Sequence, residues 1–181
     1  MSHYRRLKVN HQTYFFTQVS YRRRKIFCDD LFRNSLREAV AFTKNKYPFQ
    51  VDAWVLLPDH MHAIWTLPID DANFSMRWSL IKRITTVTCG GYYHNDKFLT
   101  PSKQRRREST IWQRRFYEHA IRDDNDFTRH MDYCHYNPVK HGLSESPCKW
   151  PYSTFHKLVN NGFYNLNWDV DFDDTGYNYG E

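Results

Sequence analysis

Short runs of aromatic and β-branched residues predict four strands along the chain. Runs of this length, bounded by charged or turn-forming residues, are typical of β-structure. The predicted strands cover residues 14–20, 50–57, 60–67 and 111–121. Only Pro58 and Asp59 separate the second run from the third. A two-residue connection of this kind indicates a β-hairpin.

Three other segments carry apolar residues at spacings of three and four, which predicts amphipathic helices. The first begins near Asp30, with Asp29 or Asp30 as its cap, and ends before Pro48. The second covers 74–89, with Ser75 as its cap and two glycines at its end. The third runs from Asp124 to His135 or Tyr136, because the residue before Pro138 resists helical geometry. The predicted apolar faces are, in that order, Leu31, Leu36, Val40 and Phe42; Trp78, Ile81, Ile84 and Val87; and Phe127, Met131 and Cys134.

The order of these elements is strand, helix, strand, strand, helix, strand, helix. This order predicts an α+β fold, a ferredoxin-like or RRM-like sandwich in which helices pack on one face of an antiparallel sheet. A short helix is predicted over 153–160, and residues 92–110 form a long basic loop. We expect a single domain over 1–163, followed by an acidic tail over 164–181.

Charge is distributed unevenly along the 181 residues. The chain has 26 Lys and Arg against 20 Asp and Glu, a net charge of +6. Residues 158–181 hold five of the acids and no Lys or Arg, so the remainder carries +11. A basic body of this size indicates a polyanionic partner, most simply nucleic acid. The alternative is a solvated basic surface without a partner.

The cysteines and the apolar runs indicate a protein of the cytoplasm. Cys28, Cys89, Cys134 and Cys148 are widely spaced, which favours reduced thiols over a disulfide framework. No signal sequence and no run of membrane-spanning length are present, so we expect no membrane partner.

His60 and His62 are the first candidates for chemistry. Side chains alternate between the two faces of a strand, so His60, His62, Ile64 and Thr66 share one face. Two parallel imidazoles are able to bind one divalent metal. Two polar positions on a solvated strand face would look the same in the sequence, and a metal site needs a third ligand.

The segment that ends in Asp132-Tyr133-Cys134-His135-Tyr136-Asn137-Pro138-Val139-Lys140 offers further candidates. Tyr133 and Asn137 are four residues apart and share a helical face if the helix reaches Asn137. The alternative is a helix end with an exposed tyrosine and a capping asparagine.

Together these motifs resemble the HUH single-tyrosine transposases, and most closely the REP-associated tyrosine transposases of bacteria. The resemblance covers residues 4–168. It is carried by Tyr4-Arg5-Arg6 and by the segments AWVLLPDHMH (53–62), IWTLP (64–68), IWQ (111–113), EHAIR (118–122), NPVKHG (137–142) and WPYSTF (150–155).

The resemblance implies a function and a set of site residues. It implies that His60, His62 and Asn137 bind Mg²⁺ or Mn²⁺, and that Tyr133 attacks a DNA phosphodiester to give a 5′-phosphotyrosine and a free 3′-hydroxyl. Tyr136 is the reserve for the nucleophile, and His135 is expected at the surface or behind the ligands. The implied substrate is single-stranded DNA with hairpins of repetitive extragenic palindromes, with no small-molecule substrate. A monomer is favoured over a dimer.

Basic runs give the candidate DNA contacts. They are Arg22, Arg23, Arg24, Lys25, Lys103, Arg105, Arg106, Arg107, Arg114 and Arg115. Two features depart from the family pattern: Arg114 stands where proline is commoner, and the loop 92–110 is longer than usual. The exact DNA target is left open by both.

The sequence leaves three functions to compare. The first is the metal-dependent strand transferase; the second is a catalytically silent module that binds folded palindromes; the third is a metal-dependent hydrolase without a covalent intermediate. The acidic tail adds a hypothesis about control, because it could fold over the basic body and compete with DNA. Deletion of 165–181 should then increase cleavage or DNA affinity at low salt.

Overall fold

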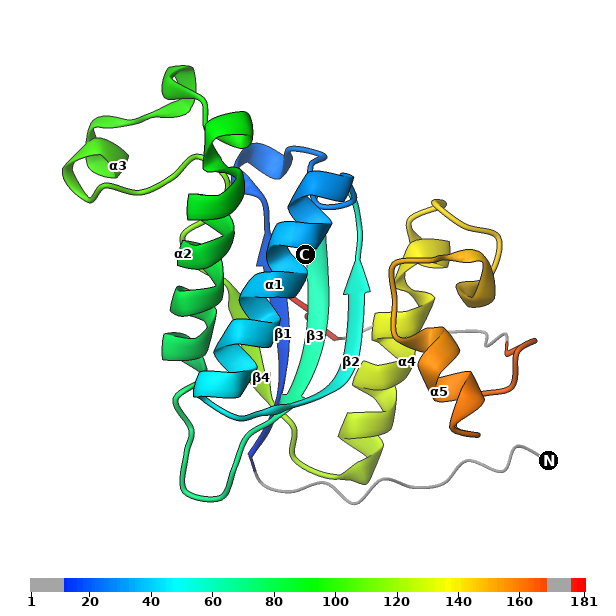
Figure 1. The fold of residues 1–181 in the computed structure, drawn as a ribbon. Helices are drawn as coiled ribbons and strands as arrows, with labels where there is room; N and C mark the ends of the chain where they lie inside the picture. The colour runs from blue at the N-terminus through cyan, green and yellow to red at the C-terminus, as the bar shows by residue number, and fades with distance from the viewer. Residues whose placement is uncertain (1–11, 169–176) are drawn as a thin grey trace.

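A computed structural model describes residues 12–168 and 177–181. Its centre is a four-stranded antiparallel sheet with the strand order β2–β3–β1–β4 (Figure 1). The strands are β1 (Thr13–Val19), β2 (Gln50–Leu56), β3 (His60–Thr66) and β4 (Tyr117–Ala120). The predicted α+β architecture and the β2–β3 hairpin are confirmed.

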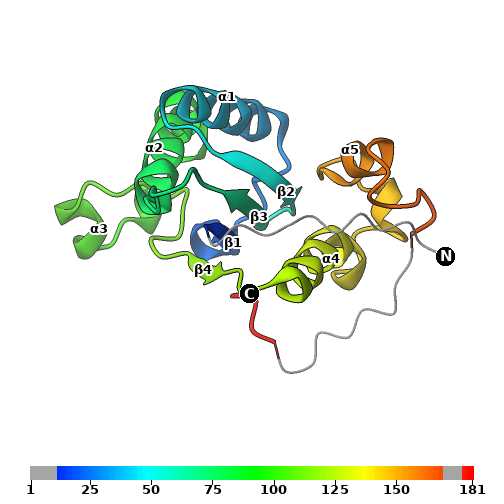
Figure 2. The same ribbon diagram turned by 90° about the horizontal axis from the view of Figure 1, so that it is seen from below.

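Helices cover both faces of the sheet (Figure 2). α1 (Asp30–Lys46) and α2 (Phe74–Tyr93) pack on one face, and α4 (Asp124–Lys140) packs on the other with α5 (Phe155–Asn160). The prediction that the helices lie on one face is wrong. The physical reason is that β3 is apolar or buried on both of its faces, so each face needs a covering layer.

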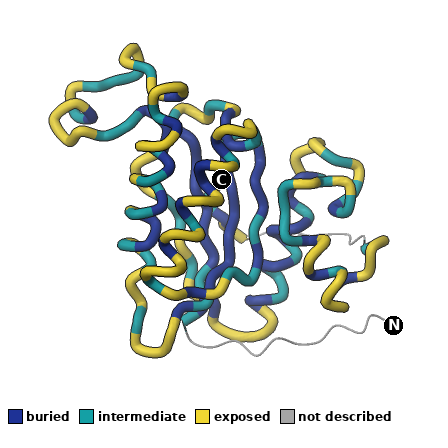
Figure 3. The backbone as a smooth tube through the Cα atoms, in the orientation of Figure 1, coloured by how far each residue is buried: buried dark blue, intermediate teal, exposed yellow. Residues whose placement is uncertain are grey.

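Alternation along β3 divides its side chains between two cores. Met61, Ala63 and Trp65 belong to the core beneath α1 and α2, where the Trp65 ring stacks on Trp78 at 4.1 Å. Ile64 belongs to the core beneath α4. The central strands are accordingly the most deeply buried part of the fold (Figure 3). His60 and His62, in register with Ile64, therefore face α4.

Two helices are longer than predicted. α2 continues through its two glycines to Tyr93, because Cys89 and Tyr93 are buried in the core and hold the last turns in place. Its cap is Asn73, whose side chain accepts a hydrogen bond from the Met76 amide at 3.1 Å, rather than Ser75. α4 continues through Pro138 to Lys140.

The predicted apolar faces of α1 and α2 are partly wrong. Leu31, Phe42 and Val87 are exposed. The buried face of α1 instead holds Phe32, Leu36, Ala39 and Thr43, and that of α2 holds Arg77, Trp78, Ile81, Thr85, Cys89 and Tyr93. Both sets keep the helical spacing, but small and polar residues take places where the sequence offered larger apolar ones.

The segment between α2 and β4 is less regular than the strands. It contains a 3₁₀ turn, η2 (Asp96–Phe98), and a short helix, α3 (Pro101–Arg105). The predicted fourth strand is reduced to β4, because Trp112 forms only an isolated bridge with Ser20. Two further 3₁₀ turns are η1 (Tyr21–Arg23) and η3 (Pro147–Lys149).

Some expectations fall on residues outside the described ranges. These are Tyr4-Arg5-Arg6 and the part of the predicted acidic tail that spans 169–176, so the proposed boundary between domain and tail stays a prediction. All four cysteines lie in the described ranges and carry free thiols. Within 12–168 and 177–181, no helix is both long enough and apolar enough to cross a membrane.

Candidate active site

His60 and His62 direct their Nε2 atoms to one point. Both side chains are buried. Nδ1 of His60 lies 2.7 Å from a carboxylate oxygen of Asp59, and Nδ1 of His62 lies 2.8 Å from the Thr17 hydroxyl. These contacts fix the orientation of both rings, as partners behind metal-binding histidines do. The Nε2 atoms are left to face the space between β3 and α4.

Tyr133 and Asn137 meet the histidines from α4. Because α4 runs past Asn137, the two residues share one helical face, as their spacing predicts. Both are buried, and the Tyr133 ring lies 5.2 Å from the ring of His62. The alternative of an exposed tyrosine and a capping asparagine is therefore wrong.

Glu181 joins these four residues, and the sequence pattern did not single it out. Its Oε1 lies 3.0 Å from Nε2 of His62 and 3.6 Å from Nε2 of His60. The same oxygen accepts hydrogen bonds from Asn137 Nδ2 at 2.7 Å and from the Tyr133 hydroxyl. One carboxylate oxygen thus contacts all four predicted site residues.

Lys140 and His141 extend the site and were also missed. Nζ of Lys140 lies 3.3 Å from the Tyr133 hydroxyl and 3.2 Å from Oε2 of Glu181. Nε2 of His141 lies 3.2 Å from Oε2 of Glu181. Lys140 follows Tyr133 by seven residues, a spacing that returns to the same helical face, so its position was open to inference from the sequence.

The site has an unusual electrostatic balance. Burial raises the pKa of Tyr133 above its ordinary value of 10, and the Glu181 carboxylate raises it further. Burial lowers the pKa of His62 to about 4. Burial alone would raise the pKa of Glu181, but its contacts with His60 and His62 outweigh burial and lower it. At neutral pH, Glu181 is therefore ionised while Tyr133 keeps its proton.

The donor atoms fit a divalent cation. Nε2 of His60 and Oδ1 of Asn137 are buried and have no hydrogen-bond partner among the described residues. Together with Nε2 of His62 they provide two imidazole nitrogens and one amide oxygen, a ligand set that suits Mn²⁺ and also admits Mg²⁺. His60, His141 and Glu181 also bring their ligand atoms within 4.8 Å of one another.

The other tyrosine and histidine candidates lie elsewhere. His135 is buried, with Nε2 3.0 Å from the Thr154 hydroxyl and Nδ1 3.4 Å from the Tyr164 hydroxyl, so the expected surface position is wrong. His119 pairs with Asp126 at 2.8 Å, next to His130. Glu118 is exposed on β4.

Two of the basic runs lie side by side. The guanidinium of Arg22 lies over the Phe98 ring at 4.9 Å, and Lys103 lies over the Tyr21 ring at 4.1 Å, which joins η1 to the segment around α3. Lys103 is buried and donates to the Ser109 carbonyl, and Arg24 donates to the Tyr93 carbonyl. The exposed candidates are Arg22, Arg23, Lys25, Arg105, Arg106, Arg107, Arg114 and Arg115.

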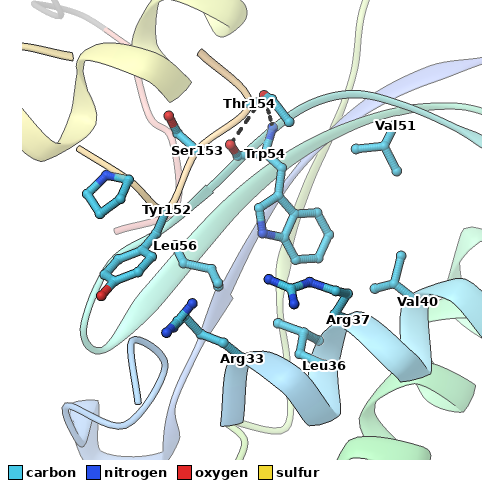
Figure 4. Close-up of a pocket in the computed structure, with 11 residues that line it drawn as sticks. Arg33, Leu36, Arg37, Val40, Val51, Trp54, Leu56, Tyr152, Ser153 and Thr154 are labelled. Atoms are coloured by element: carbon cyan, nitrogen blue, oxygen red, sulfur yellow. Dashed lines mark hydrogen bonds between the residues drawn. The ribbon is translucent and has the colours of Figure 1, made fainter. Parts of the chain in front are cut away.

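A separate pocket opens at the β2 edge of the sheet (Figure 4). Ser153 forms a bridge with Val55, so the segment around it covers this edge, as folded sheets commonly require. The pocket has a volume of about 310 Å³ and lies between this segment and α1, with Arg33 over the Tyr152 ring at 4.4 Å. It opens on the α1 face and contains none of the predicted site residues.

Known proteins share this chain's sequence and fold. Residues 8–137 match a family described as "Transposase IS200 like". A REP-associated tyrosine transposase of Escherichia coli (strain K12) is 42% identical over 174 residues, 96% of this chain and 94% of the relative. The chain belongs to the REP-associated tyrosine transposases. A solved structure of a REP-associated tyrosine transposase bound to a REP hairpin covers 100% of this chain and 98% of its own, with 41% identity and a TM-score of 0.78.

Membership of the REP-associated tyrosine transposases confirms the resemblance drawn from the sequence motifs. It also confirms the fold, since the α+β sandwich is shared with the solved relative. The family is one of transposases, which are DNA-acting enzymes.

Proposed function

We propose that this protein is a metal-dependent single-stranded DNA endonuclease and strand transferase that acts on REP-type hairpins through a covalent 5′-phosphotyrosine. One observation carries the proposal: His60, His62, Tyr133 and Asn137 come from two distant elements and contact the same carboxylate oxygen. An anionic oxygen of a DNA phosphate has the same charge and similar hydrogen-bonding capacity. The REP hairpin bound by the solved relative supports the choice of substrate.

In this proposal Tyr133 is the nucleophile. Its phenol oxygen forms a bond to the scissile phosphorus while the bond from phosphorus to the 3′-oxygen breaks. The phenolic proton leaves to water, and the departing 3′-oxygen takes a proton from water. Since phenolate is a better leaving group than an alkoxide, attack by a 3′-hydroxyl on the phosphotyrosine reverses the step and joins strands.

His60, His62 and Asn137 are the proposed ligands for Mg²⁺ or Mn²⁺. Bound there, the ion would offset the phosphate charge and polarise the phosphorus for attack. Asp59 and Thr17 keep the two imidazoles aimed at the ion. The Lys140 ammonium, 3.3 Å from the Tyr133 hydroxyl, stabilises the phenolate that forms when the proton leaves.

The exposed basic side chains supply phosphate contacts beyond the site. A hollow of about 450 Å³ between α2 and the α3 segment supports this assignment, because Lys82, Arg83, Arg107 and Arg114 line it. Burial lowers the pKa of Lys82 to about 7, and nearby Lys103 lowers it further, so a bound phosphate would favour its charged form. Glu108 also lines the hollow and pairs with Arg114 at 3.4 Å.

A denaturing gel tests the proposed reaction. The protein is incubated with Mn²⁺ and a labelled REP hairpin that carries single-stranded flanks. We expect a protein-linked DNA band that is lost in Tyr133→Phe and kept in Tyr136→Phe, the matched control three residues away. Cleavage that survives Tyr133→Phe would indicate the hydrolase, and hairpin binding without any cleavage would indicate the silent binding module.

A further inference from the structure

The peptide 177–181 places an aromatic ring on the proposed nucleophile. The rings of Tyr179 and Tyr133 are stacked, with centroids 3.6 Å apart and planes inclined by 7°. Phe15 and His130 present their rings edge-on to Tyr179 at 6.0 and 5.2 Å. Tyr179 is only 4% exposed, so its ring fills an aromatic pocket beside Tyr133.

Backbone contacts hold this peptide in a defined position. The Thr17 hydroxyl donates to the Tyr179 carbonyl at 2.5 Å, and the Tyr117 hydroxyl donates to the Asn178 carbonyl at 2.7 Å. Gly180 has a φ of +76°, and a Cβ at this position would collide with Cβ and Cγ of Tyr117. Glycine is therefore required for the peptide to pass Tyr117 and deliver Glu181 to the histidines.

The bound groups have the chemistry of a nucleotide. A flat aromatic ring lies in a stack, and an anionic oxygen lies one residue further along between His62 and Asn137. In single-stranded DNA, planar bases and anionic phosphates likewise follow one another along a flexible backbone. Stacking on aromatic side chains is a general way to hold unpaired bases.

We propose that the pocket filled by Tyr179 is a nucleobase subsite for the nucleotide next to the scissile phosphate. The peptide 177–181 occupies it as a mimic of single-stranded DNA, with Tyr179 in the place of a base and Glu181 in the place of the phosphate. This inference rests on the proposed function, because it takes Tyr133 as the residue that meets the phosphate. Peptide and substrate then exclude each other at one site.

Charge alone offers a competing explanation, since an acidic peptide on a basic protein would repel any polyanion. The two explanations differ in one respect: repulsion affects every strand with the same number of phosphates, whereas a base subsite requires bases. An abasic strand has the phosphates of DNA and no bases, so it separates them.

Binding to the full-length chain with Tyr133→Phe provides the test, because this variant keeps the ring and removes the attacking oxygen. The probes are a single-stranded 20-mer of degenerate sequence and an abasic 20-mer, compared by fluorescence anisotropy at one salt concentration. Tyr179→Ala empties the pocket, and Gly180→Ala displaces the peptide while keeping the tyrosine. Tyr177→Ala is the control, since Tyr177 is exposed and lies against Arg129.

We expect Tyr179→Ala and Gly180→Ala to tighten binding of the degenerate 20-mer about tenfold, in line with the loss or gain of one base stack. The abasic strand should change less than twofold, and Tyr177→Ala should change neither probe by more than that. Equal gains for both strands, or no gain for either, would overturn the subsite. The gel assay with Tyr133 is independent, so a base-dependent gain without a covalent band would leave the subsite and reject the nucleophile.

Discussion

One carboxylate oxygen of Glu181 lies 3.0 Å from Nε2 of His62, although 119 residues separate them along the chain. This contact closes the space in which the proposed metal ligands and nucleophile meet. The peptide must leave before a phosphate is able to enter. The hypothesis that an acidic tail competes with DNA thereby gains a specific residue and a specific place.

Replacing Glu181 by glutamine should increase covalent protein–DNA adduct formation. The substitution removes the charge that His62 and Asn137 bind, and hydrogen bonds to charged groups contribute about 1.5–3 kcal/mol, so we expect a gain of about tenfold or more. The initial rate of adduct formation on denaturing gels measures it. Glu38→Gln removes an equal charge from the exposed face of α1 and should leave the rate unchanged. Equal gains in both variants would show that only overall charge matters.

Lys140 should stabilise the Tyr133 phenolate. In the Glu181→Gln background, which removes the competing carboxylate, Lys140→Gln should lower the adduct rate about tenfold, because one charge-assisted hydrogen bond is lost. Lys149→Gln is the control, since Lys149 is exposed on η3 and pairs with Glu145. A pH series adds a second readout: the Lys140→Gln variant should need a higher pH to reach half of its maximal rate. An unchanged rate and profile would exclude this role.

Removal of the divalent metal should abolish adduct formation without abolishing hairpin binding. EDTA should eliminate the covalent band, and Mn²⁺ should restore it. In the Glu181→Gln protein, Mn²⁺ at a hundred times its dissociation constant should stabilise the fold by about 2.7 kcal/mol, visible as a higher Tm. A further His62→Ala substitution should remove that rise. A rise in Tm that persists after His62→Ala would place the ion elsewhere.

Asp126 should control acid stability through the link between β4 and α4. Its buried carboxylate accepts hydrogen bonds from the Arg122 backbone and side chain at 3.0 and 3.2 Å and pairs with His119 at 2.8 Å. Burial would raise the pKa of Asp126, but these contacts outweigh it and lower the pKa to about 2. The stabilisation is therefore complete above the ordinary pKa near 3.8 and is lost as the pH falls toward 2.

Asp126→Asn should consequently lower the free energy of unfolding by about 2 kcal/mol at pH 7 and by much less near pH 2. Urea unfolding followed by circular dichroism at several pH values measures the difference. Asp96→Asn, on the exposed turn η2, should change stability by less than about 0.5 kcal/mol at any pH. A loss that does not depend on pH would assign the effect to packing instead of charge.

The sequence by itself determined the local features of the fold and the site. Strand alternation placed His60 and His62 on one face of β3, and helical spacing placed Tyr133 and Asn137 on one face of α4. These features follow from the geometry of single elements, so they do not depend on what packs against them. The motifs also identified the family, because they keep their residue types and order along the chain.

Tertiary structure decided which of these faces meet. It brought α4 to the opposite face of the sheet from α1 and α2, carried that helix through Pro138, and placed Glu181 and Tyr179 in the site. Such contacts join residues far apart in sequence, and their choice depends on the complementary shape and charge of whole surfaces. Periodicity contains no record of that choice, which is why the sequence showed only the charge of Glu181 and not its place.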